Sequence, residues 1–308
     1  MQQDAATLQW HTDSLWSELS KLLPGLSIEV VARCESSNTV LVDRARRSSG
    51  LSEVVPSRPG ELEPISGPMP LVETTRLGRR AGDTQPCLLI AEQQTRGRGR
   101  WGRSWQSSAG ASLTCSLALP FTPPDWSGMS LAMGVALAEA LDPTGPHGAA
   151  SIGLKWPNDL MRVEAAQPLR KLGGILIESV PVGQRRMAVI GLGLNVATQP
   201  VVDLNTGFAC MQELEPGIDA PHTLARIARP WVEAVLLFQR EGFAPFKQRF
   251  ERLDCLKGRL VTTTLDDLPS GVAEGVDDNG ALLVRVGPSL RTVAVGDVSV
   301  RPSSEPPQ

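Results

Sequence analysis

Three arginines alternate with glycines in the segment Gly-Arg-Gly-Arg-Trp-Gly-Arg at residues 97–103, and no carboxylate lies among them. The planar guanidinium group binds phosphate or carboxylate oxygens in pairs, and glycine lets the backbone approach a ligand closely. Because these charges repel one another when no anion is bound, we expect a mobile loop that closes over a polyphosphate. A solvated basic turn, or an arginine-glycine segment that touches nucleic acid, is the simpler alternative.

Two further motifs place a lysine at the end of a predicted strand. The motif Lys-Trp-Pro-Asn-Asp at 155–159 would present a cation, an indole and two oxygen-bearing side chains to a nucleotide or Mg²⁺, although it can also be a plain turn. The motif Lys-Leu-Gly-Gly at 171–174 begins an apolar strand. Its paired glycines either leave room for a ligand or mark a bulge or a tight strand crossing.

The segment Gly-Leu-Gly-Leu-Asn at 191–195 lacks the third glycine of a dinucleotide-binding fingerprint and lies inside an apolar run. We therefore expect Gly191 and Gly193 to let a flat ligand lie against a sheet, and Asn195 to hydrogen-bond that ligand.

Composition argues against several classes of protein. The 308 residues carry 30 basic and 33 acidic side chains, whereas general nucleic-acid and membrane-surface binders are normally net basic. The five cysteines are an odd number without a Cys-x-x-Cys pair, so neither disulfides nor structural zinc is expected. No signal peptide is visible, and no apolar run reaches the ~20 residues that span a bilayer. We expect a globular, cytoplasmic protein.

The elements that must position these motifs form an α+β pattern. Short apolar runs predict strands at 28–32, 87–92, 111–119, 152–156, 171–180 and 187–196. Helical spacing predicts helices at 39–47, 127–141, 223–241 and 243–253, with Pro230 kinking or dividing the third. Residues 48–83 are rich in Pro, Gly, Ser and Glu, which is typical of an inserted, partly disordered loop, and we assign it no chemistry. We predict a central mixed or antiparallel sheet flanked by helices.

The end of the chain has a different pattern, in which apolar and polar residues alternate over short runs at 259–263, 271–276, 281–286 and 292–295. The tripeptide Asp-Asn-Gly at 278–280 lies between two of these runs and is a strong hairpin signal. We predict a small β-barrel here. The expected domains are residues 1–254, which include the inserted loop, and residues 255–308.

Taken together and in this order, five motifs resemble those of biotin protein ligases: Ser-Ser-Asn at 36–38, Gln94 with Gly-Arg-Gly-Arg at 97–100, and the motifs at 155–159, 171–174 and 191–195. The resemblance runs from about Glu35 to Arg301 and is interrupted only by the inserted loop. It implies the class II aminoacyl-tRNA-synthetase-like fold of biotin and lipoate ligases, with a C-terminal SH3-like β-barrel.

The resemblance also implies a reaction in two steps, with ATP and Mg²⁺ as cofactors. Biotin and ATP first give biotinyl-5′-AMP and pyrophosphate, and biotin is then transferred to a lysine of a biotin carboxyl carrier protein. In the first step a carboxylate must attack an α-phosphate, so cations have to neutralise the charge that builds up in the transition state. Lys171 would bridge the two anions, and Arg100 would help to close the site over the adenylate.

The remaining roles follow from the same resemblance. Biotin would be contacted by Ser36, Ser37, Asn38, Gln94, Arg98, Gly99, Arg100, Lys171, Gly173, Gly174, Gly191 and Gly193. ATP would be contacted by Arg98, Arg100, Arg103, Trp105, Asn158, Lys171 and Asn195. No metal ligand is fixed, since Mg²⁺ would arrive with ATP; Asp159 is a candidate that can also be structural.

The sequence departs from the family pattern at a few places. Ser37 stands where threonine is common, Trp101 stands where a basic residue is common, and the loop at 48–83 is foreign to the family. About thirty residues precede the serine motif, too few for the winged-helix module of some members, so we expect no binding to DNA. We also expect no membrane partner, and a monomer or a weak homodimer.

Two other functions compete with this interpretation. A lipoate or octanoate ligase would share the fold and the acyl-adenylate chemistry, but a plain acyl chain favours an apolar slot, whereas Ser36, Ser37 and Gln94 suit a ureido ring. A non-enzymatic RNA-binding module built on the arginine loop would use aromatic stacking platforms, which this sequence does not offer.

Overall fold

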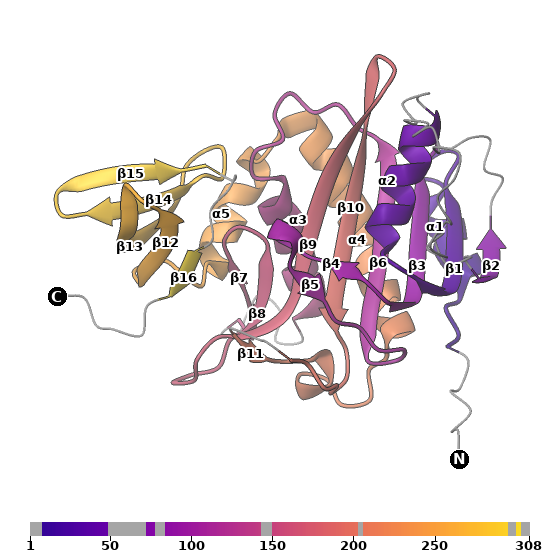
Figure 1. Cartoon of the computed structure of the whole chain (residues 1–308), viewed down its shortest axis with the longest axis horizontal. Helices are drawn as coiled ribbons and strands as arrows, with labels where there is room; N and C mark the ends of the chain where they lie inside the picture. Colours follow the sequence, from indigo (N-terminus) through magenta and orange to yellow (C-terminus); the bar gives the residue numbers. More distant parts are fainter. Residues whose placement is uncertain are drawn as a thin grey trace, which may run out of the picture. The chain divides into compact units, whose positions relative to one another are not determined.

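The computed structural model describes residues 8–48, 72–77, 84–142, 150–202, 206–294 and 300–302 (Figure 1). The chain divides into two compact units. The first comprises Met1–Thr122, Leu176–Gln199 and Asp219–Leu224, and the second comprises Pro123–Ile175, Pro200–Ile218 and Ala225–Gln308. The expected domain boundary at residue 254 stays a prediction. Among the described residues, no helix combines the length and the apolar character that crossing a bilayer requires.

The first unit is built on a mixed sheet. Its strands follow the order β2-β1-β3-β6-β10, and the last part of β9 pairs beyond β10. The pairs β1–β2, β3–β6 and β6–β10 are antiparallel, and the pair β1–β3 is parallel. The strands are β1 (Ser27–Cys34), β2 (Val72–Leu77), β3 (Cys87–Gln94), β6 (Ser112–Pro120), β9 (Arg170–Val182) and β10 (Arg185–Asn195).

Two helices cover this sheet. α1 (Thr12–Leu19) packs against β1 and β2, and α2 (Ser37–Ser48) lies along β3, β6 and β10 (Figure 1). The apolar side of α2, including Leu41 and Ala45, is buried against the core of the sheet. α2 begins two residues earlier than predicted, because Ser36 Oγ accepts the Thr39 amide at 3.4 Å and so caps the first turn. The predicted binding residues Ser37 and Asn38 therefore lie inside that turn.

Strand β2 corrects one prediction about the inserted loop. Residues 72–77 form a strand that pairs antiparallel with β1, although the sequence predicted no regular structure there. The edge of β1 offers unpaired backbone groups that an extended segment of many compositions can join, so side-chain periodicity gives little signal. Residues 49–71 and 78–83 of the predicted insertion lie outside the described residues.

The second unit contains β7 (Ile152–Lys155), β8 (Asp159–Arg162), the first part of β9 and the short strand β11 (Gly207–Phe208). β7 and β8 form a hairpin, β8 pairs antiparallel with β9, and β11 pairs parallel with β9. The helices α3 (Met129–Leu141) and α5 (Ala244–Leu253) pack on each other, and both pack on β7. The predicted mixed sheet flanked by helices is confirmed.

Helix α4 (Ala220–Glu241) continues through Pro230, so of the two predicted outcomes, a kink or a division, the division does not occur. Pro230 removes one backbone hydrogen bond, but Ile227, Trp231 and Val235 on the same stripe are buried at 0–1% exposure. Burial of that stripe stabilises the helix on both sides of the proline.

The end of the chain forms a five-stranded antiparallel sheet in the order β15-β14-β13-β12-β16. The predicted hairpin at 278–280 is confirmed, since Gly280 joins β13 to β14 with a positive φ of 79°. Within the described residues no pairing closes β15 onto β16, so the predicted barrel is seen as an open sheet. Its strands are β12 (Leu260–Leu265), β13 (Leu268–Val276), β14 (Leu282–Val286), β15 (Ser289–Val293) and β16 (Val300–Pro302).

Candidate active site

A buried cluster of hydrogen-bonding side chains lies at the start of α2, in the first unit. The Ser37 amide donates to Gln94 Oε1 at 2.6 Å, and the hydroxyls of Ser37 and Ser116 are 2.6 Å apart. Ser116 donates to Asn38 Oδ1 at 2.6 Å, and Asn38 Nδ2 donates to Glu178 Oε2 at 3.0 Å. Strands β3, β6 and β9 and helix α2 each contribute to this cluster.

The donor and the acceptor of each hydrogen bond in this cluster can be assigned. Asn38 Nδ2 faces a carboxylate and the Leu176 carbonyl, so Oδ1 must be the acceptor toward Ser116. Because a hydroxyl has one proton, Ser116 gives its proton to Asn38, and Ser37 gives its own to Ser116 at 2.6 Å and not to Gln94 Oε1, which is farther away at 3.2 Å. The Ser37 oxygen then keeps a lone pair that can accept from a ligand N–H.

Gln94 supplies the complementary donors. Its Oε1 accepts from the Ser37 amide, and in the described part of the chain no acceptor contacts its Nε2. One acceptor and a pair of amide N–H donors therefore lie side by side, which suits a cyclic urea or a comparable amide-like ring. Asn38, predicted to contact the same ring, has all its polar atoms engaged by the protein and supports the cluster instead.

Side chains of the chain itself occupy the space next to Gly191 and Gly193, the two glycines of β10. A Cβ on Gly191 would lie 2.1 Å from Asn38 Oδ1, and a Cβ on Gly193 would lie 2.6 Å from the Trp105 ring. The flat group that lies on Gly193 is therefore the Trp105 indole, which differs from the expectation that a ligand would lie against both glycines. Their role in this structure is to admit Asn38 and Trp105.

The arginine segment forms an ordered hairpin. β4 (Gly97–Arg98) pairs with β5 (Ser104–Trp105) around a short 3₁₀ turn at Arg100–Gly102. Arg98 Nη1 lies 3.3 Å from Glu178 Oε1, so a carboxylate distant in sequence neutralises one of the three arginines. Trp101 at the tip is half exposed and has a positive φ of 64°. The predicted mobility of this hairpin, and the ligand contacts of Gly99, Arg100 and Arg103, stay predictions.

A second polar cluster lies in the second unit, where β7, β8 and β9 meet. Asp159 Oδ2 accepts Lys155 Nζ at 2.7 Å, and Asp159 Oδ1 accepts Lys171 Nζ at 2.6 Å. Burial by itself would raise the pKa of Asp159, but the charges and hydrogen bonds of Lys171 and Lys155 outweigh it and hold the pKa well below its usual range. Two ammonium groups are thus held on one ionised carboxylate, ready to meet an anion.

Two glycines of β9 lie opposite Asp159 and its neighbour Leu160. Gly174 faces Asp159 across the β8–β9 pair, and a Cβ there would lie 3.4 Å from Asp159 Oδ1 and 3.5 Å from Lys171 Nζ. Gly173 is buried opposite Leu160. Asn158, predicted to lie beside the nucleotide, donates from Nδ2 to the Ile175 carbonyl at 2.8 Å and holds β8 against β9.

One prediction for the motif at 155–159 needs correction. Trp156 is fully buried, and its Nε1 donates to the Gly280 carbonyl at 3.0 Å, so its indole is not presented to a ligand. Both oxygens of Asp159 accept lysine ammonium groups, which favours the structural role that the sequence left open, and a contact of Asp159 with Mg²⁺ stays a prediction. The described residues also contain no group of three or more His, Cys, Asp or Glu arranged to hold a metal ion.

Asn195, at the end of β10, is 5% exposed and lies 3.5 Å from Gln199 Nε2. Gln199 in turn donates to Ser112 Oγ at 2.8 Å. This arrangement holds Asn195 within the first unit, and its predicted contact with the nucleotide stays a prediction.

Sequence reasoning assigned no role to two members of the clusters, Ser116 and Glu178. Ser116 and Glu178 lie in strand interiors, and neither belongs to a motif of closely spaced functional residues. A signal was present in β6, where Ser116 is a polar residue inside a strand that is buried on both faces. Lys155 was noted as a cation, but its pairing with Asp159 follows from the register of the β7–β8 hairpin.

The chain is similar to known families and proteins. Residues 79–195 match the Biotin/lipoate A/B protein ligase family, and residues 258–301 match the Biotin protein ligase C terminal domain. The Bifunctional ligase/repressor BirA of Escherichia coli (strain K12) is 35% identical over 246 residues, which cover 76% of this chain and 73% of that protein. The Biotin--[acetyl-CoA-carboxylase] ligase of Mycobacterium tuberculosis is 31% identical over 227 residues, which cover 70% of this chain and 79% of that protein.

A solved structure shares the fold. The biotin protein ligase from Aquifex aeolicus, solved in complex with biotin and ATP, matches 90% of this chain and 99% of its own chain with a TM-score of 0.64 at 21% identity. The two sequence relatives match over most of their own length, and the solved structure has the same fold. The chain belongs to the biotin protein ligase family.

Proposed function

We propose that this chain is a biotin–[acetyl-CoA-carboxylase] ligase that activates biotin as biotinyl-5′-AMP and transfers biotin to a lysine of a carrier protein. Membership of the biotin protein ligase family supports the reaction class. The observation that carries the choice of biotin is the pairing of Gln94 and Ser37, which offers N–H donors beside a hydroxyl acceptor.

Biotin recognition uses that pairing. The ureido ring of biotin has one carbonyl acceptor and two N–H donors. Gln94 Nε2 donates to the carbonyl, and Ser37 Oγ, whose own proton is directed to Ser116, accepts from an N–H. A lipoyl or octanoyl chain would leave these buried groups without partners, at a cost of roughly 1–3 kcal/mol for each group.

Adenylation uses the two lysines. A carboxylate oxygen of biotin attacks the α-phosphorus of ATP, the new O–P bond forms, and the bond to pyrophosphate breaks with its electron pair leaving on pyrophosphate. Lys171 donates to the oxygens that meet in this step and offsets their negative charge, and Asp159 holds Lys171 in position. Mg²⁺ enters bound to the phosphates of ATP, and no residue of the chain is assigned to it.

Transfer uses the arginine hairpin. Arg98 and Arg100 close over the adenylate and exclude water, which would otherwise hydrolyse the mixed anhydride. The neutral amine of the carrier lysine attacks the acyl carbon, AMP leaves with the electron pair of the broken C–O bond, and the amine loses a proton to solvent. The product is a biotinyl amide.

Mass spectrometry of a biotin carboxyl carrier domain, incubated with the purified chain, biotin and MgATP, tests this function. We expect the mass of the carrier to increase by one biotinyl group, at a single lysine, and no increase when ATP is omitted. Parallel incubation with lipoate or octanoate should leave the carrier unmodified. Modification by lipoate or octanoate but not by biotin would contradict the choice of substrate, and no modification by any acid would contradict the reaction.

A further inference from the structure

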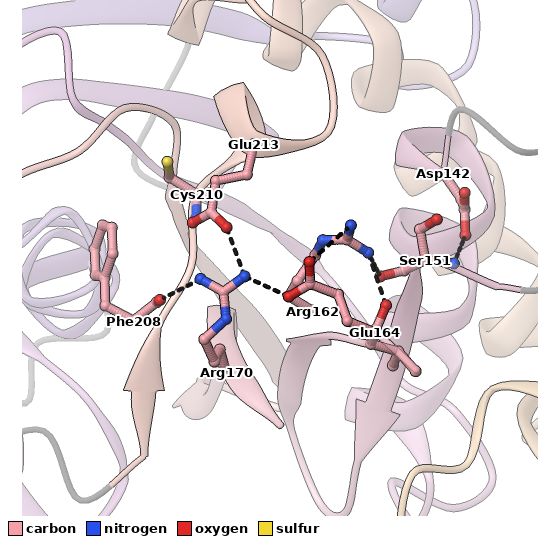
Figure 2. Close-up of polar contacts among 9 residues, drawn as sticks. Asp142, Ser151, Arg162, Glu164, Arg170, Phe208, Cys210 and Glu213 are labelled. Atoms are coloured by element: carbon pink, nitrogen blue, oxygen red, sulfur yellow. Dashed lines mark hydrogen bonds and ion pairs between the residues drawn. The ribbon is translucent and has the colours of Figure 1, made fainter. Parts of the chain in front are cut away.

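Arg170 directly precedes Lys171 and is the centre of a group of ion pairs that the proposed reaction does not use. Its guanidinium donates to the Phe208 carbonyl at 3.0 Å, to Glu164 Oε2 at 2.5 Å and to Glu213 Oε2 at 2.6 Å (Figure 2). The hydrogen bonds of Glu213 and Glu164 raise the pKa of Arg170 above its already high value. The group is therefore charged at any working pH.

Two of these partners belong to one short connector, residues 207–213. The connector begins with β11, which has only two residues and pairs with β9 so that Gly207 faces Arg170 and Phe208 faces Lys171. The Ala209 amide then donates to the Lys171 carbonyl at 2.9 Å. Because so short a strand makes few backbone hydrogen bonds of its own, the side-chain bonds of Arg170 are a large part of what holds it.

The packing around Gly207 and Glu213 lets Arg170 hold the connector against the start of β9. A Cβ on Gly207 would lie 2.9 Å from Arg170 Cγ, so the absence of a side chain lets the arginine stem lie across β11. Glu213 Oε1 also accepts the Cys210 amide at 3.1 Å, which fixes the carboxylate that Arg170 binds. Burial alone would raise the pKa of Glu213, but its hydrogen bonds with Arg170 and Cys210 lower it, so the carboxylate is ionised.

On the β8 side of β9, the charge of Glu164 offsets the repulsion between two arginines. Arg162 is the β8 partner of Arg170, and like charges directly opposite each other in a sheet are destabilising. Glu164 lies between them, with Oε1 at 3.4 Å from Arg162 Nη2 and Oε2 on Arg170 (Figure 2). The start of β9 is thus fastened to β8 on one side and to the connector on the other.

Arg170 does not share the face of Lys171. Successive side chains of a strand point to opposite faces, so the guanidinium lies on the face away from Lys171 and Asp159. We propose that Arg170 is a positioning residue, which clamps residues 207–213 to the start of β9 and thereby holds the Lys171 backbone so that its ammonium stays on Asp159. This inference rests on the proposed function, in which Lys171 is catalytic.

A direct contact between Arg170 and the phosphates of ATP would have a different signature. The two carboxylates on Arg170 would repel phosphate, so removing one of them would strengthen direct binding of ATP. Under the clamp, removing Glu213 weakens the hold on the connector and slows the reaction as removing Arg170 does. The variant Glu213→Gln therefore separates the two roles, since glutamine keeps an oxygen for the Cys210 amide but loses the ion pair.

The experiment compares Arg170→Ala, Arg170→Lys and Glu213→Gln with a matched control, Arg226→Ala. Arg226 makes two hydrogen bonds to Glu215, at 2.6 and 2.9 Å, two residues beyond Glu213, and among the described residues it makes no hydrogen bond or ion pair with β9. Pyrophosphate release from biotin and MgATP gives kcat and the KM for ATP. Hydrogen exchange at the Ala209 amide, which bonds to Lys171, reports the clamp without reference to activity.

We expect Arg170→Ala and Glu213→Gln to lower kcat by about tenfold or more, with the KM for ATP within about twofold of wild type, because displacing a reacting group by about 1 Å can cost ~100-fold. Arg170→Lys should fall between them and wild type, since one ammonium does not span three acceptors. The Ala209 amide should exchange faster in all three variants. Arg226→Ala should match wild type in kcat and in exchange at Ala209.

Wild-type kcat in both Arg170→Ala and Glu213→Gln would overturn the clamp. A higher KM for ATP in Arg170→Ala together with a lower one in Glu213→Gln would also overturn it, in favour of direct phosphate binding. If Arg170→Ala does not fold, Glu213→Gln decides the question. A wild-type protein that releases no pyrophosphate would contradict the proposed function, while exchange at Ala209 in Glu213→Gln would still show whether the clamp exists.

Discussion

Replacing Asp159 with asparagine tests the charge arrangement on which the second cluster depends. The substitution keeps the shape of the side chain and removes the negative charge that two lysines share. Lys155 and Lys171 lie 2.7 and 2.6 Å from its two oxygens, so their ammonium groups are roughly 6 Å apart and repel each other by about 3 kcal/mol at an effective dielectric constant of 20. In the wild type the carboxylate more than offsets that repulsion.

The expected loss of stability follows from burial. The side chain of Lys155 is 9% exposed, and that of Lys171 is 25% exposed. Removing one partner of a buried ion pair costs roughly 3–5 kcal/mol, and the partial exposure of Lys171 places Asp159→Asn near the lower end, at about 3 kcal/mol. Urea unfolding at pH 7 measures the difference. Asp278→Asn is the matched control, because Asp278 also pairs with a lysine, Lys247, but is 90% exposed.

The pH dependence gives a second check on the same variant. The pKa of Asp159 is lowered on folding, so its stabilising contribution is complete above the unfolded pKa of about 3.9 and is lost as pH falls toward the folded value. The difference in unfolding free energy between wild type and Asp159→Asn should shrink by about 0.7 kcal/mol between pH 7 and pH 3.5. A difference below about 1 kcal/mol at pH 7, or one that does not shrink in acid, would refute the shared-carboxylate arrangement.

Three further predictions concern the proposed reaction. Lys171→Ala should lower the rate of pyrophosphate release by about 100-fold or more while the circular dichroism spectrum stays that of the wild type, and near-normal turnover would remove Lys171 from the reaction. Glu178→Gln should raise the Kd for biotin about tenfold in calorimetry, because it removes the ion pair with Arg98 and the charged acceptor of Asn38; an unchanged Kd would separate this chain of hydrogen bonds from binding. Arg100→Gly should release the adenylate and increase biotin labelling of bystander lysines, and unchanged labelling would count against a closing hairpin.

The sequence predicted elements best where side-chain pattern decides the structure. Buried strands such as β3 and β10 and the helix α3 have long apolar runs or stripes, and their predicted positions agree with the structure. Strand β2 has no such pattern, because it joins the edge of β1 mainly through backbone hydrogen bonds. The helix continues at Pro230 because a buried stripe outweighs a local backbone preference.

The sequence predicted which motifs form the candidate site, but it predicted fewer of the contacts between their side chains. The spacing of Lys155 and Asp159 already suggested a strand end, and the β7–β8 hairpin brings the two together. Which side chain of that turn faces inward depends on packing, so Trp156 was misassigned: it is buried and bonded to Gly280. Ser116 and Glu178 come from strands far apart in sequence, and sheet register, which no local motif reports, brings them to Asn38.

Biotin-dependent exchange of labelled pyrophosphate into ATP, measured without any carrier protein, isolates the adenylation step. We expect the purified chain to catalyse this exchange with biotin and MgATP, lipoate not to replace biotin, and Gln94→Ala and Lys171→Ala each to abolish it. Exchange that proceeds without biotin, exchange supported equally by lipoate, or full exchange in either variant would contradict the claim that these residues bring a biotin carboxylate and ATP together.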